Sequence, residues 1–176
     1  STPSLMIFRH WSTLALCALL GIPAMLSAQE PARALDYGNT ILQQTDDMRS
    51  DSDSVEMLKL LGTVPPADSV YERVLVRTVS VQVDRDSFAD ALATVPLGIR
   101  QQGKFEYFFN LERIVALAGL KRYDEAVAYA DSCIKRYPAN YAFPDMKARV
   151  VNESGDHARA LKMFEANVQR FPIVAA

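Results

Sequence analysis

Apolar residues recur every three or four positions through the C-terminal part of the chain, which is the spacing of one face of an α-helix. Two such stripes are formed by Val127, Ala130, Ile134 and Tyr137 and by Ala160, Phe164, Val168 and Phe171. A proline follows each stripe, and proline cannot continue a helix because it lacks a backbone N–H. The pattern therefore predicts helices over about 124–137 and 156–171.

Another predicted helix precedes each of these. Residues 105–118 and 143–154 have helical spacing, and Gly119 and Gly155 follow them. Glycine commonly closes a helix in the left-handed conformation, where a side chain is costly. Pro144 lies near the start of its helix, where the missing N–H is harmless. The four segments predict two helical hairpins.

The two hairpins repeat with a period of 34 residues. The residues that coincide are Tyr107 with Tyr141, Ala126 with Ala160, Tyr137 with Phe171, and Pro138 with Pro172. A fixed period of this kind is typical of stacked repeats, in which each unit buries its apolar face against the next. The sequence therefore predicts an all-α fold built from antiparallel hairpins that lie side by side.

The segment LKRYDEAVAYADSCIKRYPAN resembles the second helix of a tetratricopeptide (TPR) repeat, and the resemblance covers residues 107–174. It implies a right-handed superhelical array of helical hairpins, a TPR-like α-solenoid, with repeats at 107–140 and 141–174. It also implies that Ala126 and Ala160 let the two helices of a hairpin approach closely. The sequence departs from the family's pattern at Ile114, Pro144 and His157.

Upstream of residue 107 the pattern is weaker. Phe88 and Ala91 precede Tyr123 and Ala126 by 35 residues, which indicates a degenerate repeat over about 70–105. Within it, residues 70–83 are rich in valine, and Val79, Val81 and Val83 alternate with Ser80 and Gln82 as a strand would. We expect a helix there, because a lone strand among helical hairpins would have no pairing partner. Pro96 is expected to end or bend the helix that follows.

Residues 29–68 are predicted to hold N-terminal helices and an acidic linker, ahead of a TPR-like helical domain over 69–176. A weak amphipathic pattern covers 34–44, and a short apolar segment covers 55–61. The run TDDMRSDSDS between them is expected to be a solvated linker rather than a calcium loop, since Val55 and Glu56 occupy positions that such a loop needs for a ligand and glycine. Asp68 or Ser69 is available to cap the next helix.

Residues 1–28 have the pattern of a secretory signal peptide. Arg9 and His10 precede an apolar run, and Ser27 and Ala28 offer a cleavage site before Gln29. A membrane anchor is the alternative, but the run is shorter than the ~20 residues of a spanning helix. The sequence therefore predicts export to the periplasm or the exterior, with association with the envelope as an open possibility.

The two cysteines add little chemistry. Cys17 lies inside the apolar run and only faintly resembles a lipoprotein box, so an uncleaved signal or lipidation would be the only route to the membrane. Its removal leaves Cys133 alone, which excludes an intramolecular disulfide. We expect Cys133 to be a small core residue rather than a redox thiol.

Charge and motifs argue against catalysis and nucleic-acid binding. The chain has 19 lysines and arginines against 21 acids, so it has no broad cationic field for a phosphate backbone. Its two histidines, His10 and His157, are not in a His-x-x-x-His pattern, and there is no glycine-rich phosphate loop or CxxC pair. We therefore predict no catalytic residue, cofactor, metal or small-molecule substrate.

Two partner-binding surfaces are predicted. The resemblance implies a concave face lined by first helices, and by register its members are Phe108, Glu112, Val115, Asp145, Arg149 and Asn152. For Phe108 and Val115, burial against the preceding hairpin is the alternative. The other predicted surface is the C-terminal end of the array, where Leu161, Phe164 and Val168 lack a capping helix.

These features favour a non-catalytic adaptor or scaffold of the bacterial envelope that binds a protein partner in the groove or at the C-terminal end. Two alternatives stay open. The chain could be the substrate-recruiting helical module of a larger exported enzyme, or a structural subunit that polymerises through its uncapped end.

Overall fold

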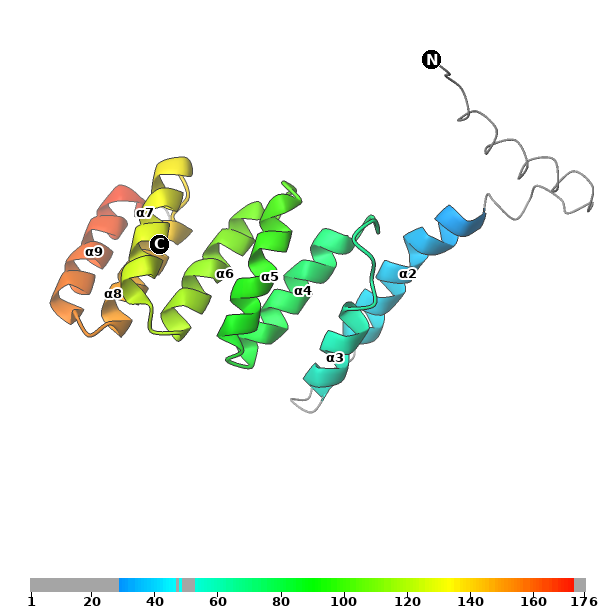
Figure 1. Ribbon diagram of the computed structural model, residues 1–176. Helices are drawn as coiled ribbons and strands as arrows, with labels where there is room; N and C mark the ends of the chain where they lie inside the picture. Colours follow the sequence, from blue (N-terminus) through cyan, green and yellow to red (C-terminus); the bar gives the residue numbers. More distant parts are fainter. Residues whose placement is uncertain (1–28, 47, 49–52, 173–176) are drawn as a thin grey trace, which may run out of the picture.

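The computed structural model describes residues 29–46, 48 and 53–172, with side chains placed from Tyr37 onward. Over these residues the chain forms eight helices and no strand, which confirms the all-α prediction (Figure 1). The predicted signal peptide at 1–28 lies outside the described residues. So do residues 47 and 49–52 of the acidic linker and the end of the second predicted repeat.

The helices follow one another in chain order along a row (Figure 1). Their bounds are α2 Gln29–Asp46, α3 Asp53–Leu61, α4 Tyr71–Asp84, α5 Phe88–Arg100, α6 Glu106–Gly119, α7 Tyr123–Arg136, α8 Ala142–Glu153 and α9 His157–Arg170. Each helix packs against the next one in the chain. In addition, α2 contacts α4, α4 contacts α6 and α6 contacts α8, whereas the helices between them do not contact one another. The even-numbered helices therefore form a continuous layer.

The valine-rich stretch at 70–83 is helical, as predicted, and forms α4. Its valines mimic a strand pattern because α4 is buried on two sides. Val74 and Val81 face a cluster that includes residues of α2 and α3, while Leu75 and Val79 face a cluster with Phe109. A helix covered on two faces carries more apolar positions than a single amphipathic stripe.

The prediction that Pro96 ends its helix is wrong. The proline lies inside α5, which continues to Arg100. A proline in this position removes one backbone hydrogen bond. The helix persists because Val95 and Gly98 on either side of the proline are buried.

The turns inside the hairpins repeat with the predicted spacing. Asp86, Lys121 and Gly155 have φ of 55°, 59° and 96°, and each lies just after the first helix of a pair. In the first two turns an N–H donates to the carbonyl five residues earlier, from Ser87 to Gln82 at 2.8 Å and from Arg122 to Leu117 at 2.9 Å. This pairing satisfies carbonyls that a helix end leaves without partners.

The left-handed prediction is therefore confirmed for Gly155 and wrong for Gly119. Gly119 lies in the last turn of α6, and the left-handed position is two residues later, at Lys121. Glycine is required at 119 for space. A Cβ there would lie 2.5 Å from Cδ2 and Cε2 of Phe88, which is inside van der Waals contact.

The same buried positions recur in successive pairs. Ala91, Ala126 and Ala160 of the second helices are 0%, 0% and 1% exposed. Leu75, Phe109 and Phe143 of the first helices are likewise buried and lie 34 residues apart. Cys133 packs in the same core as Ala126, as expected for a small core residue, and burial raises the pKa of its thiol to about 11.

The prediction that Asp68 or Ser69 caps α4 is wrong, because the N-cap residue is Val70 and no side chain caps this helix. Asp68 instead secures the turn before α4. Its Oδ1 accepts a hydrogen bond from the N–H of Val70 at 2.9 Å, and its Oδ2 accepts one from the N–H of Gly38 at 3.2 Å. Gly38 lies so close to this carboxylate that a Cβ would be 2.7 Å from Oδ1. The turn is thereby fixed to α2, which positions the first two helices for the hollow described next.

Candidate functional site

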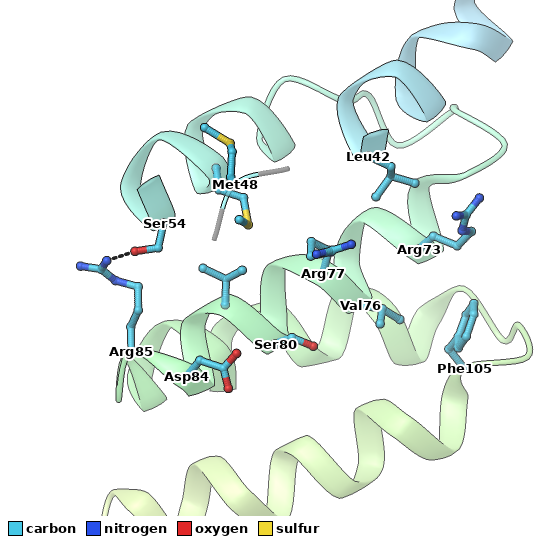
Figure 2. Close-up of a pocket in the computed structure, with 12 residues that line it drawn as sticks. Leu42, Met48, Ser54, Arg73, Val76, Arg77, Ser80, Asp84, Arg85 and Phe105 are labelled. Atoms are coloured by element: carbon cyan, nitrogen blue, oxygen red, sulfur yellow. Dashed lines mark hydrogen bonds between the residues drawn. The ribbon is translucent and has the colours of Figure 1, made fainter. Parts of the chain in front are cut away.

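A hollow of about 480 Å³ lies where α2, α3 and α4 meet (Figure 2). Residues of these three helices line it, together with Met48 after α2, Arg85 after α4 and Phe105 before α6. The full lining is Leu42, Met48, Ser54, Met57, Arg73, Val76, Arg77, Ser80, Val81, Asp84, Arg85 and Phe105. We refer to it as the α2–α4 pocket. It combines an apolar base with several charged side chains at the rim.

One face of α4 supplies most of the wall. Arg73, Arg77, Ser80 and Asp84 are three or four residues apart, so they follow one stripe along the helix. Figure 2 shows them as sticks along α4, with Arg85 beyond the end of the helix. The stripe carries positive charge at its start and middle and one acid near its end.

The three arginines are held by neighbouring helices. Arg77 forms an ion pair with Asp46 of α2. Arg85 donates to the hydroxyl of Ser54 of α3, as Figure 2 shows. Arg73 donates to the side-chain oxygen of Asn39 at 3.4 Å. Partly exposed pairs of this kind add little stability. Their effect is to hold the guanidinium groups at the edge of the pocket.

The base of the pocket belongs to the buried core between the first three helices. Leu42, Met57 and Val81 are each less than a tenth exposed and pack in one cluster. Methionine adapts its shape readily because its side chain is flexible and polarizable. The pocket base can therefore accept apolar groups of more than one shape.

Phe105 is placed at the pocket edge by the turn between α5 and α6. Its N–H donates to Oε1 of Glu72 at 3.1 Å. Gly103 lies against the same carboxylate, where a Cβ would be 2.2 Å from Oε2. The turn wraps around the Glu72 side chain, and Gln102 in this turn has a positive φ of 50°.

Two acids lie near each other beside the pocket. The pKa of Glu112 on α6 is raised, first by burial and second by the negative charge of Asp84 on α4. Both effects disfavour the charged carboxylate. The wall of the pocket is therefore less cationic near Asp84 than near Arg73 and Arg77.

The predicted groove residues on α6 are partly buried. Phe108 packs edge-to-face against Phe109, with ring centroids 5.4 Å apart, and joins the core cluster of Leu75 and Val79. This contact matches the burial that we considered as the alternative for Phe108. Val115 and Glu112 are half-buried.

The predicted groove residues on α8 form local contacts. Arg149 Nε donates to Oδ2 of Asp145 at 2.7 Å, one turn away on the same helix. Asn152 Oδ1 lies 2.8 Å from Nδ1 of His157. These three predicted residues stand on one face of α8, and they correspond by two repeat periods to Arg77, Val81 and Asp84 of the pocket.

The predicted C-terminal surface is exposed. Leu161 and Val168 on α9 are 60% and 51% exposed, and Phe164 is half-buried. The residues that correspond to Leu161 and Val168 in the two preceding pairs are half-buried, namely Leu92, Ile99, Val127 and Ile134. Among the described helices, α9 packs only against α8.

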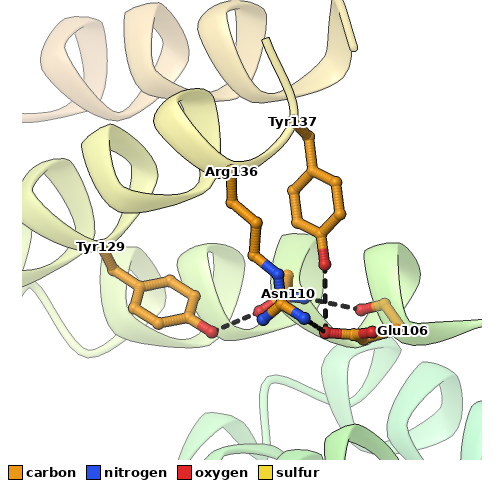
Figure 3. Close-up of polar contacts among 5 residues, drawn as sticks. All are labelled: Glu106, Asn110, Tyr129, Arg136 and Tyr137. Atoms are coloured by element: carbon orange, nitrogen blue, oxygen red, sulfur yellow. Dashed lines mark hydrogen bonds and ion pairs between the residues drawn. The ribbon is translucent and has the colours of Figure 1, made fainter. Parts of the chain in front are cut away.

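A polar cluster joins α6 to α7 (Figure 3). Glu106 accepts hydrogen bonds from Arg136 at 2.6 Å and from the hydroxyl of Tyr137 at 3.0 Å. The Tyr129 hydroxyl donates to Oδ1 of Asn110. The Asn110 side-chain Nδ2 donates to the Glu106 backbone carbonyl at 2.9 Å. The cluster ties α6 to α7 through polar contacts.

Sequence reasoning missed the arginines of the pocket. A usable signal was present in the repeat. The residues two repeat periods before Asp145, Arg149 and Asn152 are Arg77, Val81 and Asp84. The weak repeat at 70–105 was not read for groove residues. The ion pair of Arg77 with Asp46, 31 residues away, has no counterpart in any local pattern.

Other classes of site are not seen in the described part of the chain. No group of three or more histidine, cysteine, aspartate or glutamate side chains there is arranged to hold a metal ion. Among the same residues, none of the helices has the length and apolar character needed to cross a bilayer. No protein-family model matches the chain, and no curated protein or solved structure matches it either.

Proposed function

We propose that the chain is a non-catalytic protein-binding adaptor, built as a TPR-like α-solenoid whose even-numbered helices line the inner face. The proposal is supported by the contacts between α2, α4, α6 and α8, which have no equivalent among the other helices. When the helices of one layer touch and those of the other layer do not, the row of helices is curved. The layer whose helices touch then lies on the concave side. Such a curved face suits an extended or helical segment of a partner.

The observation that carries the proposal is the alignment of equivalent positions along this layer. Arg77, Leu111 and Asp145 follow one another at intervals of 34 residues, on α4, α6 and α8. At one end of this line the surface is hollowed into the α2–α4 pocket. A continuous face with one deep point can hold a long ligand and fix its register.

The location that we propose is the bacterial envelope or the exterior, on the evidence of the pattern at residues 1–28. In that compartment the adaptor would assemble or tether envelope proteins. No step of this proposal needs a cofactor.

Site-specific photocrosslinking tests the binding face. A photoreactive amino acid at Ser80 in the pocket should give a discrete crosslinked partner in an envelope extract of the source organism. The matched control carries the same residue at Ala93, which is exposed on α5. Equal crosslinking at both positions, or none at Ser80, would count against the groove.

Self-association is a second candidate function, favoured by the exposure of α9. In the preceding pairs the first helix of the next pair packs against the second helix, and the described residues offer no such cover for Leu161 and Val168. A second copy could supply it with its own first helix, α2. This would join copies end to end.

Sedimentation over a concentration series tests self-association. The wild-type chain should form larger species as its concentration rises, and Leu161→Glu with Val168→Glu should remain monomeric. Ala166→Glu, at an exposed position of the same helix, controls for the added charge. A wild-type chain that stays monomeric at all concentrations removes this candidate.

A further inference from the structure

We infer that the α2–α4 pocket recognises a segment of a partner protein in which an acidic side chain stands next to an apolar one. The inference rests on the proposed function and names the chemistry of the ligand. It follows from three features of the pocket: its charge, its apolar base and its opening onto the groove.

The charge of the rim selects an anion. Arg73, Arg77 and Arg85 line the pocket, against one lining acid, Asp84. The whole chain, by contrast, has a net charge of −2. Arginine presents five N–H donors in a planar fork, so the guanidinium groups of Arg73 and Arg77 have donors left for a carboxylate of the ligand. A pocket edge of this kind stabilises a negative group on a ligand.

The acids around the pocket favour a ligand with a single carboxylate over a polyanion. Asp46 pairs with Arg77, and Asp84 lies in the same wall. Glu112 adds a further acid close to Asp84, as the raised pKa of Glu112 records. A group with several negative charges would meet these acids as well as the arginines. One aspartate or glutamate side chain needs only Arg73 and Arg77, which lie about three and two turns before Asp84 on α4.

The apolar base selects the neighbouring residue. Leu42, Met57 and Val81 lie beneath the arginines and belong to the buried core. The hollow of about 480 Å³ is large enough for a side chain such as leucine, methionine or phenylalanine. Burying that side chain supplies affinity, at ~1.5 to 3 kcal/mol for full burial, while the carboxylate fixes the register.

The position of the pocket favours a peptide over a free small molecule. Ser80 and Asp84 continue the wall along α4, and α6 and α8 extend the same layer beyond it. A chain that leaves the pocket therefore meets more of the same surface. A free amphiphile would use only the hollow.

Selection from a random peptide library tests the inference. The probe is a phage-displayed library of random 12-residue peptides, fused at their C-termini so that only side-chain carboxylates are free. Peptides retained by the full-length chain should be enriched in an acidic residue next to Leu, Met or Phe. Arg77→Gln should lower the recovery of these peptides about tenfold, since a hydrogen bond to a charged group is lost.

Matched variants separate recognition from folding. Arg73→Gln is the second pocket variant, because Arg73 is exposed and its hydrogen bond to Asn39 is long, at 3.4 Å. Arg159→Gln on α9 removes the same charge outside the pocket and should retain all the peptides. Arg77→Lys keeps the charge without the planar fork and should recover part of the binding. Circular dichroism melts establish that each variant is folded.

The outcomes distinguish this inference from the proposed function. Retained peptides without an acidic residue, or enrichment that Arg77→Gln and Arg73→Gln leave unchanged, overturn the inference, while Ser80 crosslinking would still support the adaptor. Failure of both the library and the crosslinking overturns both. Binding of laurate that depends on Arg77, with no peptide retained, replaces the peptide by an anionic amphiphile and overturns the inference.

Discussion

Gly98 of α5 lies against the ring of Phe109 of α6 so closely that a Cβ at position 98 would be 2.3 Å from Cε1 and Cζ of the ring. Phe109 is fully buried in the cluster that also holds Leu75, Val79 and Val95. The ring therefore has little space to move away. This contact joins the second helix of one pair to the first helix of the next.

Gly98→Ala should destabilise the protein by ~1 to 3 kcal/mol through overpacking. Helix propensity alone would make the same change favourable by about 1 kcal/mol, so the sign of the effect reports the contact. Urea unfolding measures it. Gly98→Ala with Phe109→Leu should recover much of the loss because the smaller side chain makes room. Stabilisation by the single change would contradict the packing.

Ala126→Leu should cost ~1 to 3 kcal/mol, because residue 126 is 0% exposed between the two helices of its pair. The matched control is Ala166→Leu at an exposed position of α9. Denaturant midpoints for both variants check the prediction. An unchanged midpoint for Ala126→Leu would disprove the predicted repeat register at this position.

Lys121→Gly should stabilise the protein, and Gly155→Ala should destabilise it. Both residues have positive φ, at 59° and 96°, where a Cβ costs ~1 to 2 kcal/mol in the left-handed region. A Cβ at 155 meets no atom within 4 Å, so its effect comes from the backbone alone. Thermal melts of the two variants should shift in opposite directions. Shifts of the same sign would mean that the two turns are not equivalent.

Glu112→Gln should stabilise the protein at pH 7, and the gain should vanish as the pH falls below 4.5. The pKa of Glu112 is raised in the folded state, first by burial and then by Asp84, from an ordinary value of 4.5. A raised pKa means that the folded state binds a proton more tightly, so its stability falls as rising pH removes that proton. Melts from pH 4 to pH 7 test this. Glu165→Gln, at an exposed position of α9, is the matched control for the substitution itself.

Cys133 should react slowly with iodoacetamide in the folded protein. Burial raises the pKa of its thiol to about 11, with Arg136 and Arg113 opposing the shift in part, so little thiolate is present at pH 8. We expect labelling at least about a hundredfold slower than in guanidinium chloride. The experiment uses the Cys17→Ser chain, in which Cys133 is the remaining cysteine. Equal rates in the two conditions would show that the thiol is accessible.

Helix positions could be read from the sequence because their pattern is local. Apolar spacing and terminal prolines predicted α6 to α9 to within two residues at each end. The spacing of 35 residues between Ala91 and Ala126 also indicated the degenerate repeat, and both alanines are buried. The valines of α4 were harder, because burial on two sides hides the helical period.

For Gly119 and Pro96, the prediction from local sequence rules differs from the structure. Gly119 was expected to adopt a left-handed conformation, but its role is to admit the ring of Phe88. Pro96 was expected to end or bend its helix, and the helix does not end there, because α5 continues to Arg100. At Gly119 a neighbour distant in sequence outweighed a local rule.

The sequence by itself determined the helices, their repeat and the residues that face the core, since backbone hydrogen bonds within a helix fix which side chains share a face. Only the tertiary structure decided where the surface is hollowed and which charged side chains line that hollow. Arg77 meets Asp46, and Arg85 meets Ser54, across different helices. Such meetings depend on the distance and rotation between helices, which are set by the sizes of all the buried side chains together.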